Sequence, residues 1–259
     1  MAITLRSSRE IELMRKAGVV VADVLSKLKE MARPGVSTAE LDYVAAETTA
    51  QAKAQPLFKG VRNPSAKTPF PGVICASINE QVVHGIPSDS VKLKEGDILS
   101  IDFGVRLHGY CGDAAITVAI GEVPEEKRRL MGVTRQALET AIDRAAPGVR
   151  WSSIAGEMQR LAESAGFSVV REFVGHGIGT EMHEEPRVPN FVSKELLSDD
   201  IVLAEGMVLA VEPMINSGTK DVRTLKDGWT VVTKDGKCSA HFEHTIAITS
   251  DGCEVLTVK

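Results

Sequence analysis

Apolar residues recur at helical spacing in four segments of the chain, arranged as two pairs. We expect helices over residues 9–31, 38–54, 125–145 and 153–165. A Pro-Gly-Val sequence follows the first helix of each pair, at 34–36 in one half and at 147–149 in the other. Proline and glycine end helices and turn the chain. The two halves of the chain therefore share one order of helices.

Strand-like apolar runs follow each helix pair, and each run carries an acid at one end. KEGDILSID closes on Asp102 and AEGMVLAVE closes on Glu212, with one shared pattern. DAAITVAI begins with Asp113 and EHTIAIT begins with Glu243, again with one shared pattern. Duplicated halves usually pack about an approximate twofold axis, which would bring the four acids toward one centre. The repeat indicates one domain built from two halves, about 1–121 and 122–259.

The alternation of side chains along a strand predicts which way the acids point. Asp102 shares a face with Ser100, and the other three acids share their faces with alanine or threonine. A four-residue hairpin loop at 106–109 would place Asp102 directly opposite Asp113. The acid-bearing face is therefore expected to be lined with small residues.

Four converging carboxylates need a compensating charge. Two carboxylates about 5 Å apart repel by about 3 kcal/mol at an effective dielectric constant of about 20. Protonation of one acid would relieve a single pair, but four acids would need several bound protons at neutral pH. The acids could instead be solvated on an exposed face, as single strand acids commonly are. The symmetric recurrence favours a site for divalent cations.

Composition sets limits on the class of protein. Hydrophobic residues make up 43% of the 259 residues and charged residues 25%, as in ordinary soluble globular proteins. The net charge of -5 argues against direct binding of nucleic acid. No apolar run reaches the length of a membrane span or of a signal-peptide core, so we expect a cytoplasmic protein without membrane contact. The four cysteines lack a Cys-x-x-Cys pair, which favours free thiols over disulfides or a zinc-thiolate site.

The histidines fall into two groups. His176 lies between glycines in VGHGIG, where backbone or ligand can approach the ring closely, and His183 follows in HEEP. His84 has a similar glycine setting, although Gly-Ile-Pro after it also fits a plain turn. Of the remaining three, His244 is expected to point to the apolar face as a core residue and His108 to lie in a hairpin loop, while His241 has no assignment.

Taken together, the motifs VVHGIP, VGHGIG, HEEP, VEPM, KDGWT and FEHTI closely resemble those of type I methionine aminopeptidases over nearly the whole chain. The resemblance implies an α+β pita-bread fold, with two pseudo-twofold-related halves, antiparallel strands inside and helices outside. It also implies a two-metal centre whose ligands are Asp102, Asp113, His176, Glu212 and Glu243.

Ligand chemistry agrees with that implication. Four oxygen-donor residues and one imidazole suit cobalt, manganese or iron, with zinc as a further candidate. Such ions lower the pKa of bound water and polarise a carbonyl. We expect Glu212 to take the proton of the attacking water and pass it to the leaving amine. By the same resemblance, His183 would stabilise the developing oxyanion and His84 would contact the scissile amide.

The resemblance also implies a pocket for the methionine side chain, lined by Cys75 and Trp229. Thiols and flat rings suit a thioether, although Cys75 also fits a small core residue and Trp229 an anchor beside a turn. Met182, which stands directly before His183 where the family pattern has Phe, is expected in the same pocket. The segment 60–71 is longer and richer in proline than the corresponding loop, and it is either a lid with Phe70 as a wall or a surface insertion without function.

The implied activity is removal of the initiator methionine before a small second residue. The expected partners are nascent polypeptide or peptide N-termini, the ribosome is a candidate partner, and we expect a monomer. Proline-specific aminopeptidases and prolidases would share the fold and the ligands, but they generally carry an additional N-terminal domain for which 259 residues leave no room. A metal-free binding module on the same scaffold is the other alternative, but such relatives tend to lose ligands.

Overall fold

The computed structural model describes residues 3–259 and contains the four expected helices. The helices are α1 (Ser8–Met31), α2 (Thr38–Gln51), α3 (Glu125–Arg144), α4 (Trp151–Ser164) and the short, unexpected α5 (Lys194–Ser198). α1 and α2 each begin with a capping box, in which Ser7 or Ser37 exchanges hydrogen bonds with a glutamate three residues later. Within the described residues, no helix has both the length and the apolar character needed to cross a bilayer.

Short antiparallel strands make up the rest of the fold. They are β1 (Gln55–Pro56), β2 (Cys75–Ile78), β3 (Gln81–Val83), β4 (Ile98–Leu107), β5 (Tyr110–Ala119), β6 (Ser168–Val169), β7 (Gly175–Gly177), β8 (Glu184–Val188), β9 (Val208–Val211), β10 (Met214–Asn216), β11 (Val222–Thr224), β12 (Val231–Thr233), β13 (Ser239–His241), β14 (Glu243–Thr249) and β15 (Gly252–Val255). The main sheet runs β1-β4-β5-β14-β9-β7-β8, with β2 on β4 and β15 on β14. β14 of the second half thus pairs with β5 of the first.

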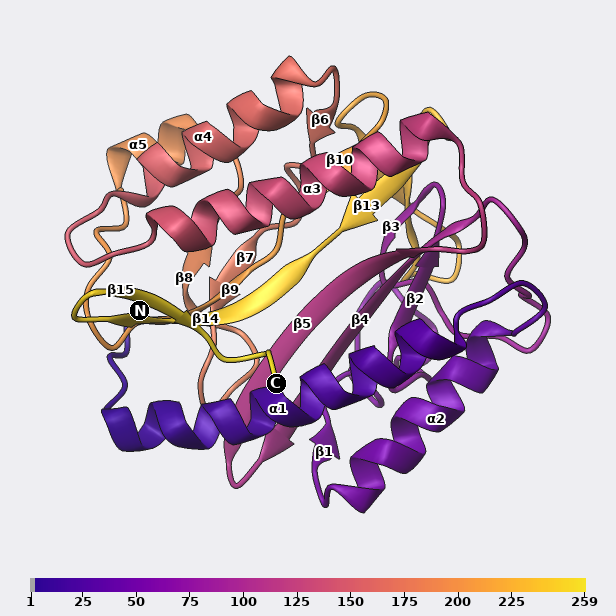
Figure 1. The fold of residues 1–259 in the computed structure, drawn as a ribbon, viewed down its shortest axis with the longest axis horizontal. Helices are drawn as coiled ribbons and strands as arrows, with labels where there is room; N and C mark the ends of the chain where they lie inside the picture. Colours follow the sequence, from indigo (N-terminus) through magenta and orange to yellow (C-terminus); the bar gives the residue numbers. More distant parts are fainter. Residues whose placement is uncertain (1–2) are drawn as a thin grey trace.

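The helices cover the outer side of the sheet in two separate groups (Figure 1). One apolar core joins α1 and α2 to β4 and β5, with Phe103 and Leu28 fully buried in it. The other joins α3 and α4 to β9 and β14, with Trp151 fully buried. The expected arrangement of helices outside and antiparallel strands inside is confirmed. The acids lie on the opposite face of the strands.

The hairpin of β4 and β5 is tighter than the sequence suggested. Its loop has two residues, His108 and Gly109, because Leu107 pairs with Tyr110. Both loop residues have positive φ, 52° and 84°, which matches the twist of a two-residue hairpin. The prediction of a four-residue loop was therefore wrong, while the placement of His108 in the loop is confirmed.

The register of the acids changes with the loop. Asp102 pairs with Ala115, and Asp113 pairs with Gly104, so the two acids are diagonal neighbours and not directly opposed. Both stay on one face because the shift is by two residues. Gly104 makes room for the acid, since a Cβ there would lie 2.9 Å from the Asp113 Oδ1.

Candidate metal centre

Three of the acids surround one alanine. Across the sheet, Asp102 of β4 and Glu243 of β14 both pair with Ala115 of β5, from opposite sides. Asp113 lies two residues before Ala115 on the same face of β5. The small side chain of this alanine leaves a hollow between three strands, as the expected lining of small residues requires.

His176 and Glu212 complete the group from the second half. His176 of β7 pairs with Ala210 of β9, and Glu212 directly follows that strand. The His176 Nε2 lies 3.5 Å from the Glu212 Oε1. Ligand atoms of Asp113, His176 and Glu243 all lie within 4.8 Å of one another, which is close enough for one metal ion to contact all three.

Glycines let β7 fit between its two neighbours. A Cβ on Gly175 would lie 2.3 Å from the Ala210 carbonyl oxygen, and one on Gly177 would lie 2.2 Å from the Glu185 carbonyl oxygen. Side chains at these positions would push the strand out of the sheet. The close approach expected around His176 is therefore present, and it places the ring over the acids.

Burial makes the cluster electrostatically unfavourable without a cation. It raises the pKa of Asp113 to about 7. Burial, together with the charges of neighbouring acids, raises the pKa of Asp102, Glu212 and Glu243 well above the usual range. The acids are not solvated on an open face, because Asp113 and Glu243 are each only 2% exposed.

Unpaired atoms in the same place fit a metal. The Asp102 Oδ1, the Asp113 Oδ1 and the Glu243 Oε1 are buried and accept no hydrogen bond. Buried acceptors without partners are costly. Divalent cations would satisfy these oxygens and offset the repulsion among the acids. The residues therefore fit a metal centre of oxygen and imidazole donors.

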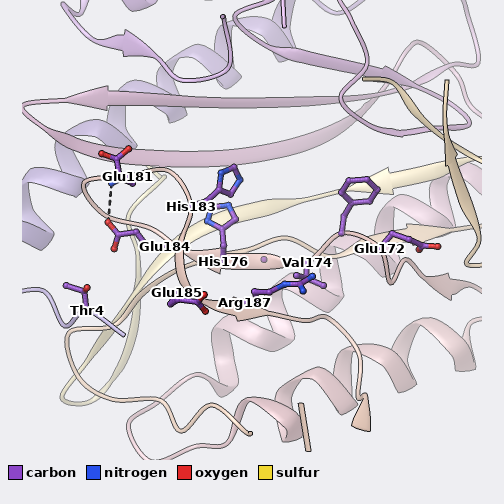
Figure 2. A pocket seen from close by; sticks show the side chains of 11 residues that line it. Thr4, Glu172, Val174, His176, Glu181, His183, Glu184, Glu185 and Arg187 are labelled. Atoms are coloured by element: carbon purple, nitrogen blue, oxygen red, sulfur yellow. Dashed lines mark hydrogen bonds between the residues drawn. The ribbon is translucent and has the colours of Figure 1, made fainter. Parts of the chain in front are cut away.

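His183 and His84 lie at the edge of the same hollow. The rings of His183 and His176 are 4.3 Å apart between centroids, and Figure 2 shows them side by side. His84 has a φ of 59° and contacts Phe173 edge to face at 5.5 Å. Burial lowers the pKa of His84 to about 4 and also lowers that of His183. Both imidazoles are therefore neutral at pH 7 and can donate one hydrogen bond each.

An apolar cavity of about 530 Å³ opens beside the acids. Cys75, Met182 and Trp229 line it, together with Phe58 and Phe70. The Phe70 and Trp229 rings meet edge to face at 5.2 Å, and Phe70 is 3% exposed. The three residues expected in the side-chain pocket are thus gathered in one place.

The segment 60–71 is fastened to this cavity. The Trp229 Nε1 donates to the Thr68 carbonyl at 3.0 Å, and the Asn63 Nδ2 donates to the Gly228 carbonyl at 2.9 Å. A Cβ on Gly228 would lie 2.5 Å from the Ser65 carbonyl oxygen, so the two segments are in close contact. Of the two alternatives for this segment, a wall carrying Phe70 agrees with these contacts.

A second cavity, of about 580 Å³, is lined by His176 and His183 and includes the exposed residue Thr4 (Figure 2). Glu181 and Glu184 lie on its rim, where the Glu181 N–H donates to the Glu184 Oε1 at 3.1 Å. The loop that carries His183 therefore closes on itself. Both cavities are lined by His176 and His183, but only the first is also lined by Asp102 and Glu212.

His241 is the site residue that the sequence analysis left without an assignment. It is 2% exposed, and its Nε2 lies 3.8 Å from the Glu243 Oε2 and 3.9 Å from the Glu212 Oε2. The signal was its position two residues before Glu243, which alternation places on the same face. His244 faces the other way as expected, half-buried, with its Nδ1 2.8 Å from the Thr257 Oγ1.

Residues 12–250 match the model of metallopeptidase family M24. The chain belongs to this family. It is 48% identical over 256 residues to a methionine aminopeptidase of Clostridium perfringens, with 99% of both chains covered. A solved methionine aminopeptidase of Thermotoga maritima has a TM-score of 0.93 and 41% identity, with 100% of both chains covered. The expected membership is confirmed.

Solved structures of the family confirm the pita-bread fold. A prolidase of Pyrococcus furiosus has a TM-score of 0.74 at 21% identity and covers 98% of this chain. This chain spans 65% of that prolidase, whereas it spans the whole of the Thermotoga protein. The likeness to the prolidase shows a shared fold alone.

Proposed function

We propose that this protein removes the initiator methionine from nascent proteins and peptides whose second residue is small, by metal-assisted hydrolysis of the first peptide bond. The observation that carries the proposal is the buried cluster of acids and His176 beside an apolar cavity of about 530 Å³. Near full-length similarity to a protein named methionine aminopeptidase supports methionine as the residue that is removed.

Asp102, Asp113, His176, Glu212 and Glu243 are proposed to hold two divalent metal ions. Four carboxylates balance the four positive charges of two divalent ions. The donor set suits manganese, iron or cobalt, with zinc as a further candidate. When bound, such ions lower the pKa of a water molecule and polarise a carbonyl group.

Three side chains are proposed to handle protons and charge. Glu212 takes the proton of the attacking water and delivers it to the leaving amine, since its carboxylate lies at the edge of both the acids and the cavity. His183 donates a hydrogen bond to the developing oxyanion. His84, which lines the same cavity, contacts the scissile amide. As neutral imidazoles, both histidines can donate without adding charge.

Cys75, Met182 and Trp229 are proposed to bind the methionine side chain. Their apolar surfaces lie together with Phe70 in one buried cluster. Sulfur and aromatic edges make favourable contacts with a thioether. We expect this cluster to accept a straight apolar side chain more readily than a branched one.

The same proposal covers the setting of the enzyme. We infer one catalytic domain over 1–259 with halves of about 1–121 and 122–259, acting in the cytoplasm as a monomer. The ribosome is a candidate partner, because the substrate is the start of a growing chain. Neither nucleic acid nor membrane is needed for this reaction.

A peptide panel tests the function directly. Apo protein is loaded with each candidate ion in turn and given peptides that begin Met-Ala, Met-Lys and Ala-Pro. We expect release of methionine from Met-Ala alone. Cleavage before proline regardless of the first residue would instead assign a proline-specific aminopeptidase, and protein that takes up no metal and cleaves nothing would indicate a binding module.

A further inference from the structure

His241 points at two of the proposed metal ligands without bonding to either. Its Nε2 is nearly equidistant from the Glu212 and Glu243 Oε2 atoms, at 3.9 and 3.8 Å. That nitrogen is buried and has no hydrogen-bond partner. A buried ring nitrogen without a partner is unusual, and it is aimed at the most crowded group of carboxylates in the fold.

The backbone of His241 is fixed on both sides by one hydroxyl. The His241 N–H donates to the Thr117 Oγ1 at 2.9 Å, and the Thr117 Oγ1 lies 2.7 Å from the His241 carbonyl oxygen. Thr117 belongs to β5, the strand that carries Asp113, and its hydroxyl also lies 2.8 Å from the Ser100 Oγ. The imidazole is thus held at a set distance from the acids of both halves.

We propose that His241 is a positioning residue, whose Nε2–H donates a hydrogen bond to the Glu212 or Glu243 carboxylate and turns the other oxygens toward the metal ions. A movement of about 1 Å by either carboxylate brings its oxygen within hydrogen-bond distance. Hydrogen bonds to charged acceptors are the stronger class. Groups that orient ligating side chains typically change metal affinity by about 10-fold to 100-fold.

The hydrogen bond lowers the repulsion that the ligands feel before metal arrives. Without a donor, the two carboxylates would rotate away from each other, and metal would have to realign them. His241 does not belong to the compact group of three ligand atoms, which come from Asp113, His176 and Glu243. Its role is therefore to orient ligands, and this inference rests on the proposed metal centre.

Three variants test the role. His241→Leu removes the donor, His241→Gln retains an N–H of similar reach, and His244→Gln is the matched control on the outer face of the next strand. Apo forms are titrated with manganese and with cobalt by calorimetry, and the absorption spectrum of the cobalt-loaded forms is recorded. We expect about 10-fold to 100-fold weaker binding for His241→Leu, recovery of most of the affinity for His241→Gln, and no change for His244→Gln.

The outcomes separate the possible roles. Wild-type affinity in His241→Leu would overturn the proposal, and so would a loss in His241→Gln as large as in His241→Leu. A ligand-field spectrum that changes strongly in His241→Gln would make His241 a direct ligand, which also overturns it. Failure of the wild-type protein itself to bind metal would instead reject the metal centre.

A measurement on the unaltered protein avoids variants that fold poorly. In zinc-loaded protein with ¹⁵N-labelled histidine, a proton coupled to the Nε2 of His241 is expected at low field, protected from exchange with water. An Nε2 without a proton would overturn the proposal. The His241→Gln spectrum, which must lack this signal, assigns it.

Discussion

At the scale of single residues, burial and not hydrogen bonding sets the character of the site. Burial raises the pKa of Asp113 to about 7, and burial together with the charges of neighbouring acids raises the pKa of Asp102, Glu212 and Glu243 well above the usual range. The same burial lowers the pKa of His176 and His84 to about 4. Metal ligands have to be deprotonated. The imidazoles are already neutral, and the carboxyl groups need a bound cation to ionise fully.

Glu212→Gln tests the proposed proton carrier. An amide cannot accept the proton of the attacking water, so kcat for a Met-Ala peptide is expected to fall by about 10²-fold to 10⁴-fold. Turnover and bound metal are measured on the same sample. Glu139→Gln, on α3 away from the cavities that surround His176, is expected to leave turnover unchanged. Near-normal turnover by metal-loaded Glu212→Gln would remove Glu212 from this role.

At the scale of helices, strands and loops, neighbouring elements are held together by close contacts between their backbones. The helix α1 lies against the C-terminal segment, where a Cβ on Gly18 would sit 2.0 Å from the Leu256 carbonyl oxygen. The turn at 225–230 and the segment 60–71 are joined in the same way through Gly228. Glycines thus mark the places where one element touches the backbone of another.

Gly18→Ala and Gly132→Ala form a matched pair of helix substitutions. Gly18→Ala should lower the free energy of unfolding by roughly 1–3 kcal/mol, because the new methyl group meets backbone that cannot move aside easily. Gly132 is exposed on α3 with nothing near its Cβ position, so Gly132→Ala should raise the free energy of unfolding by roughly 0.5–1 kcal/mol. Urea unfolding measures both, and equal effects would contradict the assigned contact.

Phe70→Ala tests the segment 60–71 as a wall of the side-chain pocket. Loss of the ring opens the cavity beside Trp229, so kcat/KM for Met-Ala should fall by about 10-fold to 200-fold, mostly through KM. Lys67→Ala, an exposed change in the same segment, is expected to have no effect. An unchanged KM in Phe70→Ala would show that the segment 60–71 is a surface insertion and not a wall of the pocket.

At the scale of the whole molecule, the proposed metal centre lies where the first and second halves of the chain meet. Asp102 and Asp113 come from the hairpin of the first half, and His176, Glu212 and Glu243 come from the second. Since β14 pairs with both β5 and β9, the sheet joins the halves directly beneath the acids. Metal binding is expected to stabilise the folded protein by an amount that grows with the logarithm of the affinity.

The affinity for metal should fall as the pH falls below about 7. In the apo protein Asp113 retains a proton up to a pKa of about 7, and the metal must displace it. For each proton displaced, Kd rises about tenfold per unit of pH below that pKa. The difference in Tm between metal-loaded and apo protein is therefore expected to be larger at pH 8 than at pH 6. An equal difference at both pH values would show that the acids are already ionised.

Much of the site could be predicted from the sequence because it lies on strands. Alternation with period two placed the acids on one face with Ala115 and Thr245, whatever the register of the strands. The hairpin register itself was predicted wrongly. Leu107 pairs with Tyr110, so the loop has only two residues, and His108 adopts the positive φ that such a loop requires. As a result, Asp102 and Asp113 are diagonal neighbours and not directly opposed, but they still share one face of the sheet.

The sequence by itself determined the four helices, the duplicated acid-bearing strands, the family and the group of acids with His176. These follow from local periodicity and short motifs, which depend on neighbours within a few residues. Only the tertiary structure decided that His241 lies close to Glu212, and that Phe70 lies against Trp229. Such contacts join segments far apart in the chain, and their geometry depends on how strands pair and how loops close, which periodicity does not encode.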